Sequence, residues 1–81
     1  MTVTNAIKKL EKAGFTVTAD GGRFRAVKDD AQVIEFHRNG RSDDVVCIRV
    51  RYATDKDDAM TDYCAGMWVK NITQAISLAH Y

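Results

Sequence analysis

The chain has 81 residues, of which 46% are hydrophobic and 28% charged, so it fits one small globular domain over residues 1–81 and not the disordered or fibrous classes. Twelve basic and eleven acidic side chains leave a net charge of +1, so attraction to a charged partner must come from how the charge is distributed. No apolar run approaches the roughly 18 residues of a membrane span, and the first residues lack the parts of a signal peptide, so we expect a cytoplasmic protein without membrane contact.

The first predicted element is a helix. Ala6 and Leu10 belong to an apolar stripe with helical spacing. Thr4 can cap the first turn, and Gly14 can adopt the left-handed conformation that often follows a helix. These residues predict a helix over residues 4–13.

Four strands are predicted next from alternating apolar and polar residues. Residues 15–18 and 23–27 indicate a hairpin around the turn sequence at residues 20–22. Residues 32–37 predict a third strand, and residues 45–52, the run densest in β-branched side chains, predict a fourth. The side chains expected to face the core are Phe15, Val17, Phe24, Ala26, Ile34, Phe36, Ile48, Val50 and Tyr52.

A second helix is predicted near the C-terminus. The apolar positions there have helical spacing, and Asn71 and Gln74 are placed to form a capping box before a helix that begins at Ile72. Two alternatives stay open at this point. The helix begins near Gly66, or residues 63–69 form a fifth strand.

The order of these elements predicts an α+β fold. Strands that follow one another through short connections form an antiparallel meander most readily. We therefore expect a four-stranded antiparallel sheet, with the N-terminal and C-terminal helices packed on one of its faces.

Basic side chains gather on the sheet face turned away from the helices. The candidate partner-binding residues are four arginines and one histidine: Arg23, Arg25, His37, Arg49 and Arg51. Glu35 lies among them and is placed to pair with one or two of the arginines. A guanidinium presents a planar fork to phosphate or carboxylate, so this face is a candidate surface for an anionic partner. A solvated face whose charges keep the sheet soluble explains the same residues.

Partners of two classes fit a basic sheet face: a protein, or a nucleic acid whose phosphates contact the four arginines. Sheet-surface RNA-binding domains stack bases on exposed aromatic side chains, whereas Phe24 and Phe36 are predicted to point inward. Protein binding is therefore the first hypothesis and nucleic-acid binding the alternative. The arginines and the acidic residues 54–62 have opposite signs, which also permits a homodimer.

No catalytic, cofactor or metal motif stands out. Cys47 and Cys64 match no zinc spacing and are interpreted as buried free thiols. His37 is placed to approach Cys47 on the adjacent strand, but such coincidences are common on a charged face. The acidic stretch 53–62 reads as a solvated loop and lacks the glycine and glutamate of a calcium-binding loop. We expect a non-catalytic protein without a cofactor or metal.

A spaced pattern from about Val33 to Leu78 resembles small proteins and domains of bacteriophages and other mobile elements, and among these the large polyvalent protein-associated domains. The residues that carry the resemblance are Cys47–Arg51, Asp57, Asp58, Asp62, Tyr63, Gly66, Asn71, Ala75 and Ile76. The resemblance transfers no catalytic residue. It implies a phage or prophage protein inside a bacterial host, where small proteins without active sites commonly act by binding, so a host or phage protein is the first partner expected.

Overall fold

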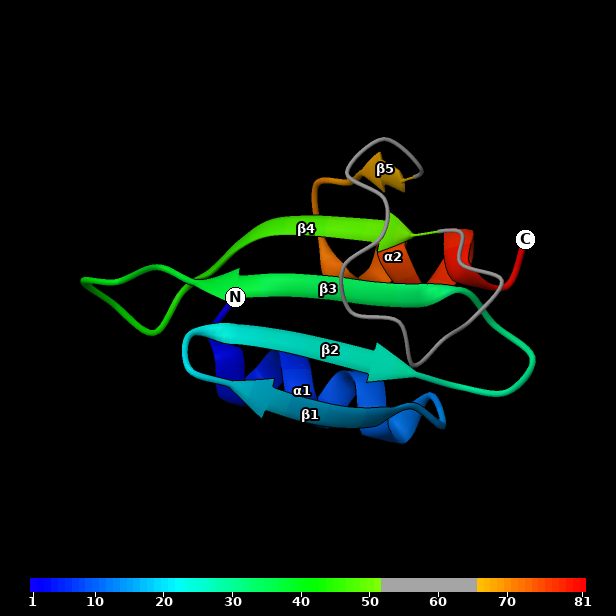
Figure 1. Ribbon diagram of the computed structural model, residues 1–81, viewed down its shortest axis with the longest axis horizontal. Coiled ribbons are helices and arrows are strands. Elements are labelled where there is room, and N and C mark those ends of the chain that lie inside the picture. The colour runs from blue at the N-terminus through cyan, green and yellow to red at the C-terminus, as the bar shows by residue number, and fades with distance from the viewer. Residues whose placement is uncertain (52–65) are drawn as a thin grey trace.

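The computed structural model describes residues 1–51 and 66–81, which form two helices and a five-stranded antiparallel sheet (Figure 1). The elements in chain order are α1 (Val3–Lys12), β1 (Thr16–Asp20), β2 (Arg23–Val27), β3 (Val33–Arg38), β4 (Val45–Arg51), β5 (Gly66–Trp68) and α2 (Ile72–Ala79). Each strand pairs with the next one in sequence, which gives the sheet order β1-β2-β3-β4-β5. The predicted α+β meander is confirmed, with β5 added to the four strands expected.

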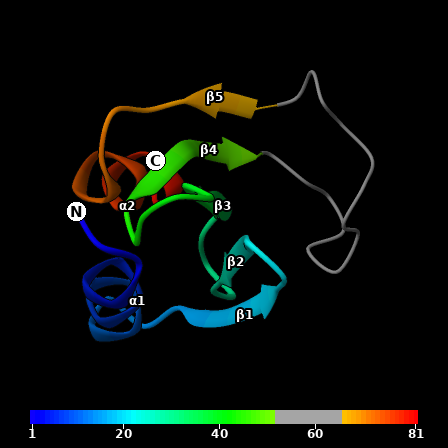
Figure 2. The same cartoon turned by 90° about the vertical axis from the view of Figure 1, so that its left-hand side faces the viewer.

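Both helices lie on one face of the sheet, and the hydrophobic core fills the space between these two layers (Figure 2). Leu10 of α1 and Ile72 of α2 are fully buried in the same cluster as Ile34 of β3 and Val50 of β4. The other predicted inward residues are also buried there or packed against it: Phe15, Val17, Phe24, Ala26, Phe36 and Ile48. Tyr52, the last member of the predicted set, lies outside the described residues.

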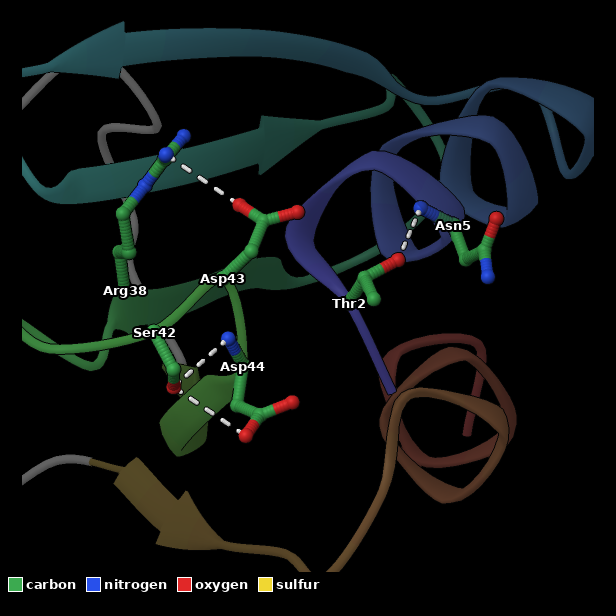
Figure 3. Close-up of polar contacts among 6 residues, drawn as sticks. All are labelled: Thr2, Asn5, Arg38, Ser42, Asp43 and Asp44. Carbon is green, nitrogen blue, oxygen red and sulfur yellow. Dashed lines mark hydrogen bonds and ion pairs between the residues drawn. The ribbon is translucent and has the colours of Figure 1, made fainter.

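Helix α1 begins one residue earlier than predicted, because Thr2 caps it and Thr4 does not. The Asn5 N–H donates to Thr2 Oγ1 at 3.2 Å (Figure 3). A sequence pattern cannot show why Thr2 is held in place: it forms an isolated bridge with Asp44, and the Val45 N–H donates to the Met1 carbonyl at 3.0 Å. The predicted stop is confirmed, since Gly14 follows the helix with a φ of 96° that suits glycine.

The loop between β3 and β4 is held by its own polar side chains (Figure 3). Ser42 Oγ donates to Asp44 Oδ2 at 3.2 Å and accepts from the Asp44 N–H at 3.3 Å. Arg38 forms an ion pair with Asp43 at 3.2 Å, and its guanidinium lies 5.6 Å from the ring centroid of Phe24. These contacts hold the loop together, and the loop in turn holds Thr2, the cap of α1, through the bridge at Asp44.

Helix α2 begins at Ile72, as the capping-box interpretation predicts. Asn71 Oδ1 accepts from the Gln74 N–H at 2.8 Å, and Gln74 Oε1 accepts from the Lys70 N–H at 3.0 Å. The return bond therefore reaches the residue before the cap instead of the cap itself. Because α2 begins only at Ile72, residues 66–68 lie outside the helix and form β5.

His80 connects the end of α2 to the turn before β3. The Ile76 carbonyl can only accept, so His80 Nδ1 carries the proton, and Nε2 accepts from the Lys28 ammonium at 2.9 Å. The His80 ring also meets Phe15 edge-on at 5.6 Å, and the Gln32 N–H donates to the Ala79 carbonyl at 2.8 Å. These contacts give His80 a structural role.

Candidate binding face

A β-bulge in β4 decides which side chains share the face that the helices leave uncovered. Glu35 pairs with Arg49 and His37 pairs with Val46, so two residues of β4 lie opposite Phe36 alone. Cys47 is the extra residue, with a φ of 54°. The alternation of side chains between the two faces holds from Ile48 to Arg51 and breaks at Cys47. Val46, and not Cys47, therefore shares a face of the sheet with Arg49.

Cys47 itself is exposed, so the prediction that its thiol is buried is wrong. The reason is the bulge, because an extra residue is left out of the ladder and away from both packed faces. Neither Cys47 nor His37 makes a side-chain hydrogen bond within the described part of the chain, so the hypothetical Cys-His pair is not formed. Cys64 lies outside the described residues. Across residues 1–51 and 66–81 no group of three potential metal-ligating side chains comes together.

Glu35 is the centre of a buried ion-pair network on this face. Its Oε1 accepts from Arg49 Nη2 at 2.8 Å and from Arg51 Nε at 3.1 Å. The exposed fractions are 11% for the Glu35 side chain, 16% for Arg49 and 2% for Arg51. On the other side of β3, Arg25 of β2 lies directly opposite Glu35 in register. Two of the five predicted site residues therefore bind one carboxylate, and a third, Arg25, is its neighbour in strand register.

The burial of these arginines corrects the expectation that all of them point into water. Arg51 is buried, Arg25 and Arg49 are half-buried, and Arg23 alone among the four is exposed. The Nη2 of Arg51 is buried and has no hydrogen-bond partner among the described residues. Arg49 and Arg51 share the one carboxylate of Glu35, and charges removed from water interact more strongly than charges at a wet surface.

The two remaining predicted residues lie together at one end of the same face. Arg23 of β2 is directly opposite His37 of β3, and His37 is in turn opposite Val46 of β4. His37 is half-buried. The face therefore has an exposed cation at this end and the buried network around Glu35 at its middle.

Trp68 is the functional candidate that the sequence prediction missed. It pairs with Arg49 across the β4–β5 ladder, so its indole is on the face of the arginines. The side chain is 65% exposed, and the Arg49 guanidinium carbon lies 5.9 Å from the ring centroid. The sequence left residues 63–69 open between a helix that begins near Gly66 and a fifth strand, and only the fifth strand places Trp68 on this face. We call the uncovered face with Arg23, Arg25, Glu35, His37, Arg49, Arg51 and Trp68 the binding face.

No protein-family model, curated protein or solved structure matches this chain. The resemblance to phage domains therefore stays a prediction. Within residues 1–51 and 66–81, neither helix has the length and apolar character needed to cross a membrane.

Proposed function

We propose that this protein is a non-catalytic binding protein that recognises an acidic partner through the binding face. The observation that carries the proposal is the exposed indole of Trp68 held beside the Arg49 guanidinium. Tryptophan and arginine dominate the energetics of protein interfaces, because each offers a large contact area together with a polar group. Because Trp68 is 65% exposed, much of its apolar surface is in contact with water, and a bound partner would bury that surface.

The charge of the binding face indicates what kind of partner it accepts. The network around Glu35 has more guanidiniums than carboxylates, and Arg23 adds an exposed positive charge. Carboxylate side chains complement a positively charged face, so we propose an acidic protein segment. The resemblance in the second half of the chain favours a host or phage protein inside a bacterial cell.

Capture of partners from a bacterial lysate tests this proposal. Immobilised wild type, Trp68→Ala and Lys9→Glu would be compared, with and without nuclease. Lys9 is exposed on α1, on the other side of the molecule, and gives a matched surface control. We expect the wild type and Lys9→Glu to retain the same nuclease-resistant protein and Trp68→Ala to lose it. Equal capture by all three proteins would contradict the proposal.

Single-stranded nucleic acid is the second candidate, and Trp68 is the observation that favours it. Bases stack on exposed aromatic side chains of sheet surfaces, with nearby arginines adding a cationic contribution. Arg49 and Arg51 already bind Glu35, which leaves fewer donors for phosphates than the sequence indicates. The chain has one tryptophan, so its fluorescence reports directly on the face. Quenching by an oligonucleotide that weakens steeply with salt would support this candidate, and constant fluorescence at low salt would remove it.

A further inference from the structure

The loop between β3 and β4 contains the one asparagine of the sequence that is followed by glycine, Asn39 before Gly40. Residues 39–42 form a β-turn, in which the Ser42 N–H donates to the Asn39 carbonyl at 3.1 Å. Asn39 and Gly40 are both exposed, and a Cβ placed on Gly40 would meet nothing within 4 Å. The Gly40 N–H makes no hydrogen bond to any described residue. The Gly40 nitrogen is therefore accessible to the side chain of the residue before it.

The Asn39 side chain is folded along the chain toward the residues that follow it. Its Oδ1 accepts from the Arg41 N–H at 3.3 Å, a bond that asparagine commonly makes to the residue two positions on. The ring of atoms closed by this bond contains both Cγ of Asn39 and the nitrogen of Gly40, so the two atoms are held near each other. The Arg41 N–H also contacts the oxygen that becomes negative when a nucleophile adds to Cγ, and such a donor stabilises the developing charge.

We propose that Asn39 is a site of spontaneous deamidation, a covalent modification that the chain carries out on itself. The Gly40 nitrogen forms a bond to Asn39 Cγ, and the bond from Cγ to the side-chain nitrogen breaks. The proton of the Gly40 N–H ends on the leaving group, which departs as ammonia. The product is a five-membered succinimide. Water then opens this ring at one of its two carbonyl carbons and leaves either aspartate or isoaspartate, and no partner of the protein takes part.

Isoaspartate at position 39 would loosen the contacts that hold the start of α1. The Asn39 N–H donates to the Asp44 carbonyl at 2.9 Å, and Asp44 forms the bridge with Thr2, the cap of α1. The backbone of isoaspartate runs through the former side chain and has one more carbon. Its N–H and C=O are therefore spaced differently, and the bonds to Asp44 and Ser42 no longer fit together.

The other two asparagines lack the features of Asn39 and serve as internal references. Asn5 lies in α1, where the N–H of the next residue, Ala6, already donates to a backbone carbonyl at 2.9 Å. Asn71 precedes Ile72, a buried β-branched residue whose side chain hinders approach to its nitrogen. Deamidation should therefore be concentrated at Asn39.

Peptide mapping by mass spectrometry, during incubation of the folded full chain in mildly alkaline buffer, measures the rate at each asparagine. Asn39 should react at least about tenfold faster than Asn5 or Asn71. Gly40→Ala is the matched variant, because the space around Gly40 is open and its φ lies outside the left-handed region. The added Cβ hinders the nitrogen, so this variant should slow the reaction at Asn39 by about tenfold or more. Equal rates at the three asparagines, or an unchanged rate in Gly40→Ala, would overturn the inference.

Amide hydrogen exchange tests the effect on α1. The Val3 N–H donates to the Asp43 carbonyl at 2.7 Å and should exchange faster once position 39 has become isoaspartate. The Val69 N–H, which donates to the Ile48 carbonyl at 3.0 Å, should keep its rate. Gly40→Ala incubated in parallel should show no change at Val3. An unaltered Val3 rate in the modified protein, or the same acceleration in Gly40→Ala, would overturn the proposed effect on α1.

Discussion

Replacing Glu35 by glutamine is expected to lower the free energy of unfolding by about 3–5 kcal/mol. The substitution preserves the size of the side chain and removes its charge. Arg51 and Arg49 both donate to Glu35 Oε1, at 3.1 and 2.8 Å, and the Arg51 side chain is 2% exposed. A guanidinium buried to this degree cannot recover its hydration when the carboxylate is neutralised. The cost is therefore that of a buried charge left without its counter-ion.

This loss is large compared with the stability of so small a domain. At about 0.05–0.15 kcal/mol per residue, 81 residues give about 4–12 kcal/mol in total. Urea unfolding followed by circular dichroism would measure the difference, and the melting temperature would fall by roughly 4–8 °C per kcal/mol. Asp43→Asn is the matched control. It makes the same chemical change in the Arg38 ion pair, where both side chains are about half exposed at 47% and 45%, and should cost less than about 1 kcal/mol.

The comparison between the two variants decides whether the reasoning is sound. If Glu35→Gln costs no more than Asp43→Asn, burial does not make this network different from an ordinary surface ion pair. A high-salt repeat adds a second criterion. Salt should reduce the small effect at Asp43 and leave most of the effect at Glu35, because buried charges are poorly screened.

Further predictions concern the bulge, the face and a helix cap. Cys47→Gly should raise the free energy of unfolding, measured in urea, by up to about 1 kcal/mol, because the φ of 54° strains any residue with a Cβ. A stabilising effect of Cys47→Val would argue against that strain. Arg51→Ala should lower the free energy of unfolding by about 2 kcal/mol or more, because Arg51 is buried. Arg23 is exposed, so Arg23→Ala should cost less than about 0.5 kcal/mol. Equal melting temperatures of the two variants would contradict this difference. Asn71→Ala should cost about 1 kcal/mol by thermal melting, while Asn71→Asp should retain the cap and most of the stability.

The parts of the fold that follow from short-range pattern were predicted well. Alternation in β2 and β3 placed Phe24, Ile34 and Phe36 in the core, and Asn71 with Gln74 located the start of α2. Each of these signals is contained within one element or one turn. The cap of α1 was missed because Thr2 is fixed by the loop at Asp44, which is distant in sequence.

The candidate site was predicted only in part, because its decisive features are long-range. The bulge at Cys47 depends on how β4 pairs with β3, and alternation alone gives no sign of it. The burial of Arg51 depends on packing around Glu35, whereas strand alternation led to an expectation of solvated arginines on the face turned away from the helices. Trp68 stayed undecided between helix and strand because its spacing with later apolar residues is helical, and its pairing with Arg49 places it in a strand.

The contribution of Trp68 to affinity for a captured partner tests the role of the binding face most directly. Isothermal titration calorimetry with the purified partner would compare the wild type, Trp68→Ala and the α1 control Lys9→Glu. An interface hot spot contributes about 2 kcal/mol or more, so Trp68→Ala should weaken binding at least about 30-fold while Lys9→Glu stays within about twofold. Equal dissociation constants for the wild type and Trp68→Ala would show that the partner binds elsewhere.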